Sequence, residues 1–126
     1  MNGNRGIILD SNIIIYLSQR KLSLNDIFID SVNYSVSIIT YMEILSYNFK
    51  IKEEEEFIYK LFSFLNIIDI DRTIAKKVIS LKKKRKIKLP DAIIVLTALV
   101  YNATLYTNDK QLHNIEELKV RFFDIK

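Results

Sequence analysis

The sequence has 126 residues, 49% of them hydrophobic, no cysteine, one histidine and a net charge of +4 at pH 7. This length allows one domain with a substantial core, and the apolar content argues against disorder. The absence of cysteine excludes disulfides, thiolate metal sites and cysteine nucleophiles, and a single histidine makes a Ser-His-Asp triad hard to build. No apolar run reaches the ~20 residues that span a bilayer. The first apolar run stops at Asp10, unlike a signal peptide, so we expect a soluble cytoplasmic protein.

Short apolar runs alternate with helical patterns throughout the chain. In chain order we predict a strand at 6–10, a helix at 12–18, a short helical turn within 22–31, a strand at 34–38, helices at 40–45 and 52–66, a strand at 67–70, helices at 72–86 and 89–100, and strands at 103–107 and 120–124. Neither a repeat nor a linker interrupts this alternation. It predicts one α/β domain over residues 1–126, with a mainly parallel sheet and helices on both faces.

The helix predicted at 89–100 has almost no polar face and should lie buried at the centre of the domain. Pro90 suits a first helical position because its missing N–H would have no partner there. Asp91 places a negative charge at the positive end of the helix dipole. A carboxylate is therefore expected at the mouth of an apolar core.

The helix predicted at 40–45 carries a start signal of its own. Thr40 and Glu43 have the spacing of a capping box, in which each side chain accepts a backbone N–H of the first turn. This pattern predicts that Glu43 lies in the first turn, directly after the second strand.

Acidic side chains recur at equivalent places in this scheme. Asp10 ends the first strand, Glu43 and Asp91 open helices, and Asp109 follows the fourth strand. Each also has a local explanation: a helix cap, a capping box, the helix dipole or a turn. In an open parallel sheet, however, the carboxyl ends of the strands line one crevice, which is where ligands bind. We therefore expect the four acids to face one another.

Clustered carboxylates repel one another, and a hard divalent cation is the simplest way to neutralise them. All-oxygen ligands favour Mg²⁺ or Mn²⁺ over zinc. Such a pocket can activate water and stabilise the leaving oxygen of a phosphodiester. Asn12 and Thr107 are short polar side chains at the same edge, able to orient a carboxylate or a metal-bound water. The pattern predicts a metal-dependent nuclease.

Four short motifs in this order resemble those of PIN-domain proteins, most closely the VapC-type ribonuclease toxins. They are Leu9-Asp10-Ser11-Asn12, Thr40-x-x-Glu43-Ile44-Leu45, Pro90-Asp91-Ala92-x-Ile94 and Tyr106-Thr107-Asn108-Asp109. The resemblance implies a three-layer α/β/α fold, Mg²⁺- or Mn²⁺-dependent ribonuclease activity, a homodimer and a cognate antitoxin. It also implies that Asp10, Glu43, Asp91 and Asp109 are the catalytic metal ligands, supported by Asn12 and Thr107.

One position departs from that pattern. Many relatives have a second acid two residues after the last one, where this chain has Gln111. With one carboxylate fewer, we expect one well-held metal ion and a weaker second ion at most.

A dense run of positive charge precedes the helix at 89–100. Its members are Lys82, Lys83, Lys84, Arg85, Lys86 and Lys88. These cations could simply be a solvated helix end, where positive charge suits the dipole. They could also contact RNA phosphates near Asp91, with a steep salt dependence. His113, after the last acid, is either a surface side chain or a general acid.

Two other functions remain open from the sequence. The chain could be an RNA- or protein-binding module that keeps the fold without the chemistry, or an RNA-processing nuclease of the same fold. Divalent-metal binding that depends on Asp10 and Asp91 would separate a nuclease from a binding module. A phosphoacceptor receiver domain fits poorly, because Ser11 and Asn12 stand where its second acid would be and no suitable lysine follows the last strand.

Overall fold

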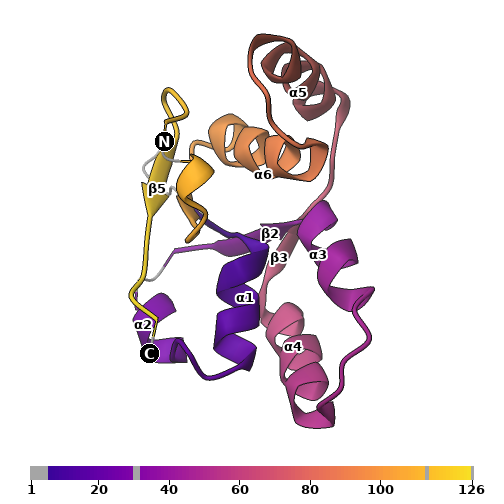
Figure 1. Ribbon diagram of the computed structural model, residues 1–126, viewed down its shortest axis with the longest axis vertical. Coiled ribbons are helices and arrows are strands. Elements are labelled where there is room, and N and C mark those ends of the chain that lie inside the picture. Colours follow the sequence, from indigo (N-terminus) through magenta and orange to yellow (C-terminus); the bar gives the residue numbers. More distant parts are fainter. Residues whose placement is uncertain (1–5, 30–31, 113, 126) are drawn as a thin grey trace.

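A parallel sheet of five strands lies between two layers of helices in the computed structural model, which describes residues 6–29, 32–112 and 114–125 (Figure 1). The strands are β1 (Ile7–Leu9), β2 (Tyr34–Ser37), β3 (Asn66–Ile68), β4 (Thr104–Tyr106) and β5 (Lys119–Arg121). The helices are α1 (Ser11–Ser18), α2 (Leu24–Ile27), α3 (Ile38–Leu45), α4 (Lys52–Phe64), α5 (Arg72–Lys84) and α6 (Leu89–Val100), with a 3₁₀ turn, η1 (Lys110–Leu112). This confirms the predicted α/β fold.

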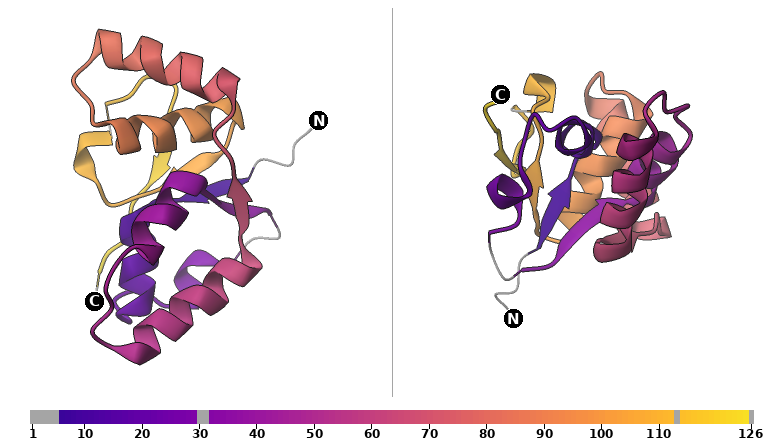
Figure 2. Two further views of the ribbon diagram at one scale, coloured as in Figure 1. Left: turned by 90° about the vertical axis from the view of Figure 1, so that its right-hand side faces the viewer. Right: turned by 90° about the horizontal axis from the view of Figure 1, so that it is seen from below.

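The strand order is β3-β2-β1-β4-β5, and every neighbouring pair is parallel. The chain runs outward from β1 to one edge of the sheet, then returns through α5 and α6 to the other side. Figure 2 shows α5 and α6 covering one face while α1 and α4 cover the opposite face. The order reverses beside β1, between β2 and β4, which is where open parallel sheets bind ligands at the carboxyl ends of their strands.

The central strand β1 divides the hydrophobic core into two halves. Ile7 and Leu9 pack with the side chains of α1 and α4, whereas Ile8 packs with those of α5 and α6. Successive side chains of a strand point to opposite faces, so a short, fully apolar strand can serve both layers. All three side chains are at most 6% exposed.

Helix α6 is the buried helix of the layer that α5 and α6 form, as its apolar sequence predicts. Every residue from 92 to 98 is buried. The one polar side chain in this stretch, Thr97, donates its hydroxyl to the carbonyl of Ile93 at 2.7 Å, so it adds no unsatisfied polar group to the core.

The two longest described helices, α4 and α5, each have 13 residues and bury one face. Asp71 caps α5 by accepting the N–H of Ile74 at 2.8 Å. Within the described residues, no helix combines the length and the apolar character needed to cross a membrane.

The predicted capping box at Thr40 and Glu43 is wrong. Helix α3 begins at Ile38, directly after β2, and its cap is Ser37, whose hydroxyl accepts the N–H of Ile39 at 3.2 Å. Thr40 is fully buried inside the helix. Because the serine at the strand end caps the helix earlier, Glu43 lies in the second turn and not the first.

Other boundaries shift by one to three residues. The predicted strand at 67–70 lies at 66–68, and the one at 120–124 lies at 119–121. The helices predicted at 52–66 and 72–86 end at Phe64 and Lys84. Apolar side chains continue past several of these ends, so the sequence pattern alone extends the elements.

Candidate active site

Asp10 occupies the first position after β1 and also caps α1. Its Oδ1 accepts the N–H of Ser11 at 2.7 Å, and its Oδ2 accepts the hydroxyl of Thr107 at 2.6 Å. The side chain is only 5% exposed. The local explanation of Asp10 as a helix cap is therefore correct, and it is compatible with a role in a site because one oxygen is directed to the neighbouring strand.

Asn12 and Thr107, the two predicted supporting residues, lie beside Asp10. The amide of Asn12 donates to Oδ2 of Asp10 and to the hydroxyl oxygen of Thr107, both at 3.4 Å. The Thr107 hydroxyl also accepts the N–H of Asp109 at 3.0 Å. These contacts join the carboxyl ends of β1 and β4 and hold Asp10 in one orientation.

Three of the predicted acids interact electrostatically. Burial raises the pKa of Asp10 above its ordinary range; hydrogen bonds from Thr107 and Ser11 oppose this, and the charges of Asp91 and Asp109 reinforce it. Burial also raises the pKa of Asp91, which the charge of Asp109 raises further and that of Lys88 lowers. The site thus concentrates negative charge without full compensation.

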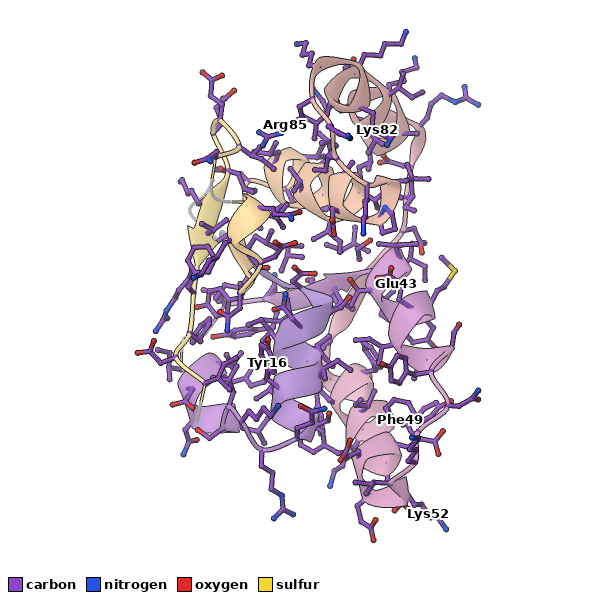
Figure 3. All side chains as sticks on the ribbon, in the orientation of Figure 1. Tyr16, Glu43, Phe49, Lys52, Lys82 and Arg85 are labelled. Carbon is purple, nitrogen blue, oxygen red and sulfur yellow. The ribbon has the colours of Figure 1, made fainter. Side chains whose placement is uncertain are left out.

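Glu43 lies at the margin of this group. It is exposed, and its Oε1 accepts the Ser11 hydroxyl at 3.3 Å. Figure 3 shows its side chain extending from α3 toward the start of α1. Glu43 contacts the site through Ser11, and its charge is not among the causes that raise the pKa of Asp10 or Asp91.

The donor set has the chemistry of a Mg²⁺ or Mn²⁺ site: carboxylate, amide and hydroxyl oxygens beside an excess of negative charge. In the described part of the chain, no three acidic or histidine side chains stand close enough together to hold an ion as they are. One oxygen of Asp109 accepts the N–H of Gln111 at 3.0 Å, directed to its own turn. Mg²⁺ commonly uses one or two carboxylates and keeps several waters, so the residues fit such an ion without a closed cage.

The side chains of the predicted basic run line two different grooves, except Lys83, and Arg85 lines both grooves. Four side chains of the run line a groove together with Asp91 and Gln111, and these are Lys82, Arg85, Lys86 and Lys88. Lys84 lines a different groove, which also contains Glu116 and Glu117. Lys83 is exposed and lines neither. His113, a possible general acid by sequence, lies outside the described residues.

Two further residues, which the sequence pattern did not identify as supporting residues, also hold the site together. Ser11 links Asp10 to Glu43 through its backbone and side chain. Asn108 donates its backbone N–H to Oδ1 of Asn12 at 3.1 Å. Both lie inside the quoted motifs, next to a candidate acid, and that adjacency is the only signal that points to them.

The side chain of Asn108 fastens the segment after β5 to the site. Its amide donates to the carbonyl of Phe123, and its carbonyl accepts the N–H of Phe123, both at 2.9 Å. The ring of Phe123 packs against that of Tyr106 at a centroid distance of 4.9 Å, and the Arg121 guanidinium lies over both rings. The C-terminal segment therefore supports the loop that carries Asp109.

Replacing Asn108 with alanine should destabilise the domain by about 1–3 kcal/mol, because two backbone groups of Phe123 lose their partners. Thermal denaturation would measure this loss. The matched control is Asn114→Ala: that residue is exposed, and the contact it makes with Arg85 uses its backbone carbonyl, which the substitution keeps. Equal melting temperatures for the two variants would contradict the assigned role of Asn108.

The order of the strands, the acids at their carboxyl ends and the α/β/α layers define a PIN domain. The sequence pattern of the PIN domain family matches residues 7–118, so the chain belongs to this family. This agrees with the resemblance seen in the four motifs. No sequence match is found among curated proteins.

Solved structures show the same fold. A chain of a toxin–antitoxin complex from Klebsiella pneumoniae is 31% identical, with a TM-score of 0.75 over 89% of this chain and 94% of that chain. VapBC2 from Rickettsia felis, bound to a DNA fragment from its promoter, contains a chain that is 23% identical, with a TM-score of 0.79 over 94% and 99%. VapBC-1 from nontypeable Haemophilus influenzae contains a chain that is 24% identical, with a TM-score of 0.73 over 93% of this chain and 97% of that chain. The last two support the fold alone.

Proposed function

We propose that this protein is a divalent-metal-dependent endoribonuclease that acts in the cytoplasm as the toxin of a toxin–antitoxin pair. The observation that carries the proposal is the buried, hydrogen-bonded Asp10 facing the charges of Asp91 and Asp109 at the carboxyl ends of a parallel sheet. Asp10 and Asp91, whose charged forms are destabilised by burial and by neighbouring acids, are costly in a purely structural role. They suit a site that holds a cation.

Asp10, Asp91 and Asp109 would hold Mg²⁺ or Mn²⁺, with Glu43 at the edge of the site acting through a bound water. An ion held there supplies charge to activate a water and to stabilise the leaving oxygen of a phosphodiester. Because Gln111 stands where many relatives have an acid, we expect one well-held ion per chain.

The chain's other residues would fix the geometry of the site. Thr107 and Asn12 direct their donors at one oxygen of Asp10, so the carboxylate cannot rotate freely. Such outer hydrogen bonds orient a metal ligand and commonly contribute 10- to 100-fold in affinity or activity. Ser11, through its hydroxyl, would place Glu43 in the same way.

The similarity to a chain of a toxin–antitoxin complex supports a cognate antitoxin as the partner. We expect this partner to cover the acidic site in the inactive state. A homodimer is also expected. Large apolar side chains stay exposed on α3 and α5 and beside β3, among them Met42 at 47% and Ile79 at 55%. Exposed apolar side chains of this kind favour association between copies of a chain.

The test is cleavage of a mixed cellular RNA pool by the purified protein with Mn²⁺, with Mg²⁺ or with EDTA. The double variant Asp10→Asn, Asp91→Asn is assayed in parallel, after circular dichroism shows that it is folded. Cleavage that requires the metal and disappears in the variant supports the proposal. A folded wild-type protein that is inert with both metals would instead favour a non-catalytic binding module.

A further inference from the structure

The groove beside Asp91 is a charged surface that adjoins the proposed acidic site. It runs along the end of α5, the turn at 85–88 and η1, and it contains Lys82, Arg85, Lys86, Lys88, Asp91 and Gln111. Four cations and one carboxylate therefore share one hollow, so the net charge of the groove is positive.

Two of these cations also hold the groove in shape. The Lys82 ammonium donates to the carbonyl of Ile87 at 2.7 Å, and the Arg85 guanidinium donates to the carbonyl of Asn114 at 3.2 Å. Figure 3 shows both side chains where α5 leads into α6. Each contact uses one donor of a group that has three or five, so both side chains keep N–H groups for an anionic ligand.

Lys86 and Lys88 have a different role. Both are exposed, and no hydrogen bond within the described residues engages either ammonium. Lys88 precedes α6 without capping it through its side chain, so the helix does not require a lysine there. These two lysines can be removed with little effect on the fold.

The second groove in this region is a poorer site for a polyanion. It contains Lys77, Lys84 and Arg85, but Glu116 and Glu117 lie in the same hollow and offset their charge. It also lacks any of the candidate acids. The contrast between the two grooves separates cations that face the site from cations that merely end a helix.

We propose that the groove formed by Lys82, Arg85, Lys86 and Lys88 binds the phosphates of the RNA strand on one side of the bond that is cleaved at the acidic site. This rests on the proposed function and extends it by naming the path of the substrate. A strand whose scissile phosphate lies at Asp91 must continue to either side, and Asp91 is itself one of the residues that line this groove. Lysine and arginine provide affinity through phosphate contacts that do not depend on base identity.

The experiment compares two double variants that remove the same charge. The groove variant is Lys86→Ala, Lys88→Ala, and the control is Lys83→Ala, Lys84→Ala. Binding of a fluorescent single-stranded RNA is measured by anisotropy in EDTA, where no cleavage occurs, over a series of salt concentrations. Circular dichroism and the melting temperature confirm that both variants are folded.

We expect the groove variant to bind RNA at least tenfold more weakly, whereas the control should change by less than threefold. For the groove variant, the slope of log affinity against log salt concentration should fall in magnitude by about 1.4, because each lost phosphate contact on a single strand contributes about 0.7. With Mn²⁺ present, the groove variant should raise KM for RNA cleavage, as expected for groups that bind the substrate.

Each contrary result overturns a distinct claim. Equal losses of RNA affinity in both variants would overturn the groove and leave only diffuse positive charge. Unchanged RNA binding together with a selective loss of polyglutamate binding would assign the groove to an acidic protein partner instead. If the wild-type protein binds RNA through this groove but cleaves none with Mn²⁺ or Mg²⁺, the nuclease function fails while the groove stands.

Discussion

The Asp10→Asn variant is expected to lose about 100-fold or more in kcat/KM for RNA cleavage while its fold remains intact. A catalytic ion stabilises the transition state by several kcal/mol, and each 1.4 kcal/mol corresponds to a factor of about ten in rate. Asparagine keeps a similar shape and remains a good helix cap, so α1 should still begin at Ser11. The loss should therefore be a loss of charge at the site, measured by steady-state kinetics with Mn²⁺.

Asp71→Asn is the matched control for this variant. Asp71 also caps a helix, is exposed, and does not contribute to the raised pKa of Asp10 or Asp91. The control makes the same chemical change at the same kind of position, and its cleavage rate should stay within about twofold of wild type. Equal activity in Asp10→Asn and Asp71→Asn would remove Asp10 from the chemistry.

The Asp91→Asn variant is expected to be more stable than wild type when no divalent ion is present. Burial and the charge of Asp109 raise the pKa of Asp91 in the folded protein. The folded state then binds more protons than the unfolded state, so the free energy of unfolding falls as the pH rises through the folded pKa. Asparagine has no charge to bury, and the variant should avoid this loss at pH 7.

The same reasoning predicts how metal and pH act on the wild type. In EDTA, its melting temperature should rise as the pH is lowered from neutral toward the raised pKa of Asp91, and this rise should be smaller in Asp91→Asn. At neutral pH, Mn²⁺ at about 100 times its Kd should stabilise the wild type by about 2.7 kcal/mol, and it should stabilise the variant much less. A variant that is less stable than wild type in EDTA, or that gains equally from Mn²⁺, would contradict this account of Asp91.

Much of the fold follows from local patterns in the sequence. Helix α6 is predictable because its residues are apolar on all sides and Pro90 and Asp91 mark its start. Strands β1, β2 and β3 are predictable because each contains apolar side chains in a short run and precedes a capped helix. The order β3-β2-β1-β4-β5 is not, since it depends on which strands pair across long separations, and short apolar strands carry no pairing code.

The candidate site is likewise predictable from local sequence patterns only in part. Asp10, Asn12 and Thr107 meet because the ends of neighbouring parallel strands share one edge, which the alternation of strands and helices predicts. Glu43 is displaced because Ser37 competes with Thr40 as the cap, and the two are hard to rank from sequence. The contact between Asn108 and Phe123 joins residues 15 apart, with η1 and β5 between them, so no local sequence pattern predicts it.

The most direct test of the central claim is a crystal structure with Mn²⁺, in which anomalous scattering identifies the ion without reference to activity. We predict one strong peak per chain, coordinated by carboxylate oxygens of Asp10 and of Asp91 or Asp109. A second peak, if present, should be weaker, because Gln111 supplies no carboxylate. The peak should be absent in Asp10→Asn, Asp91→Asn crystals. A wild-type map at saturating Mn²⁺ with no peak among these acids would contradict the claim that they form a metal site.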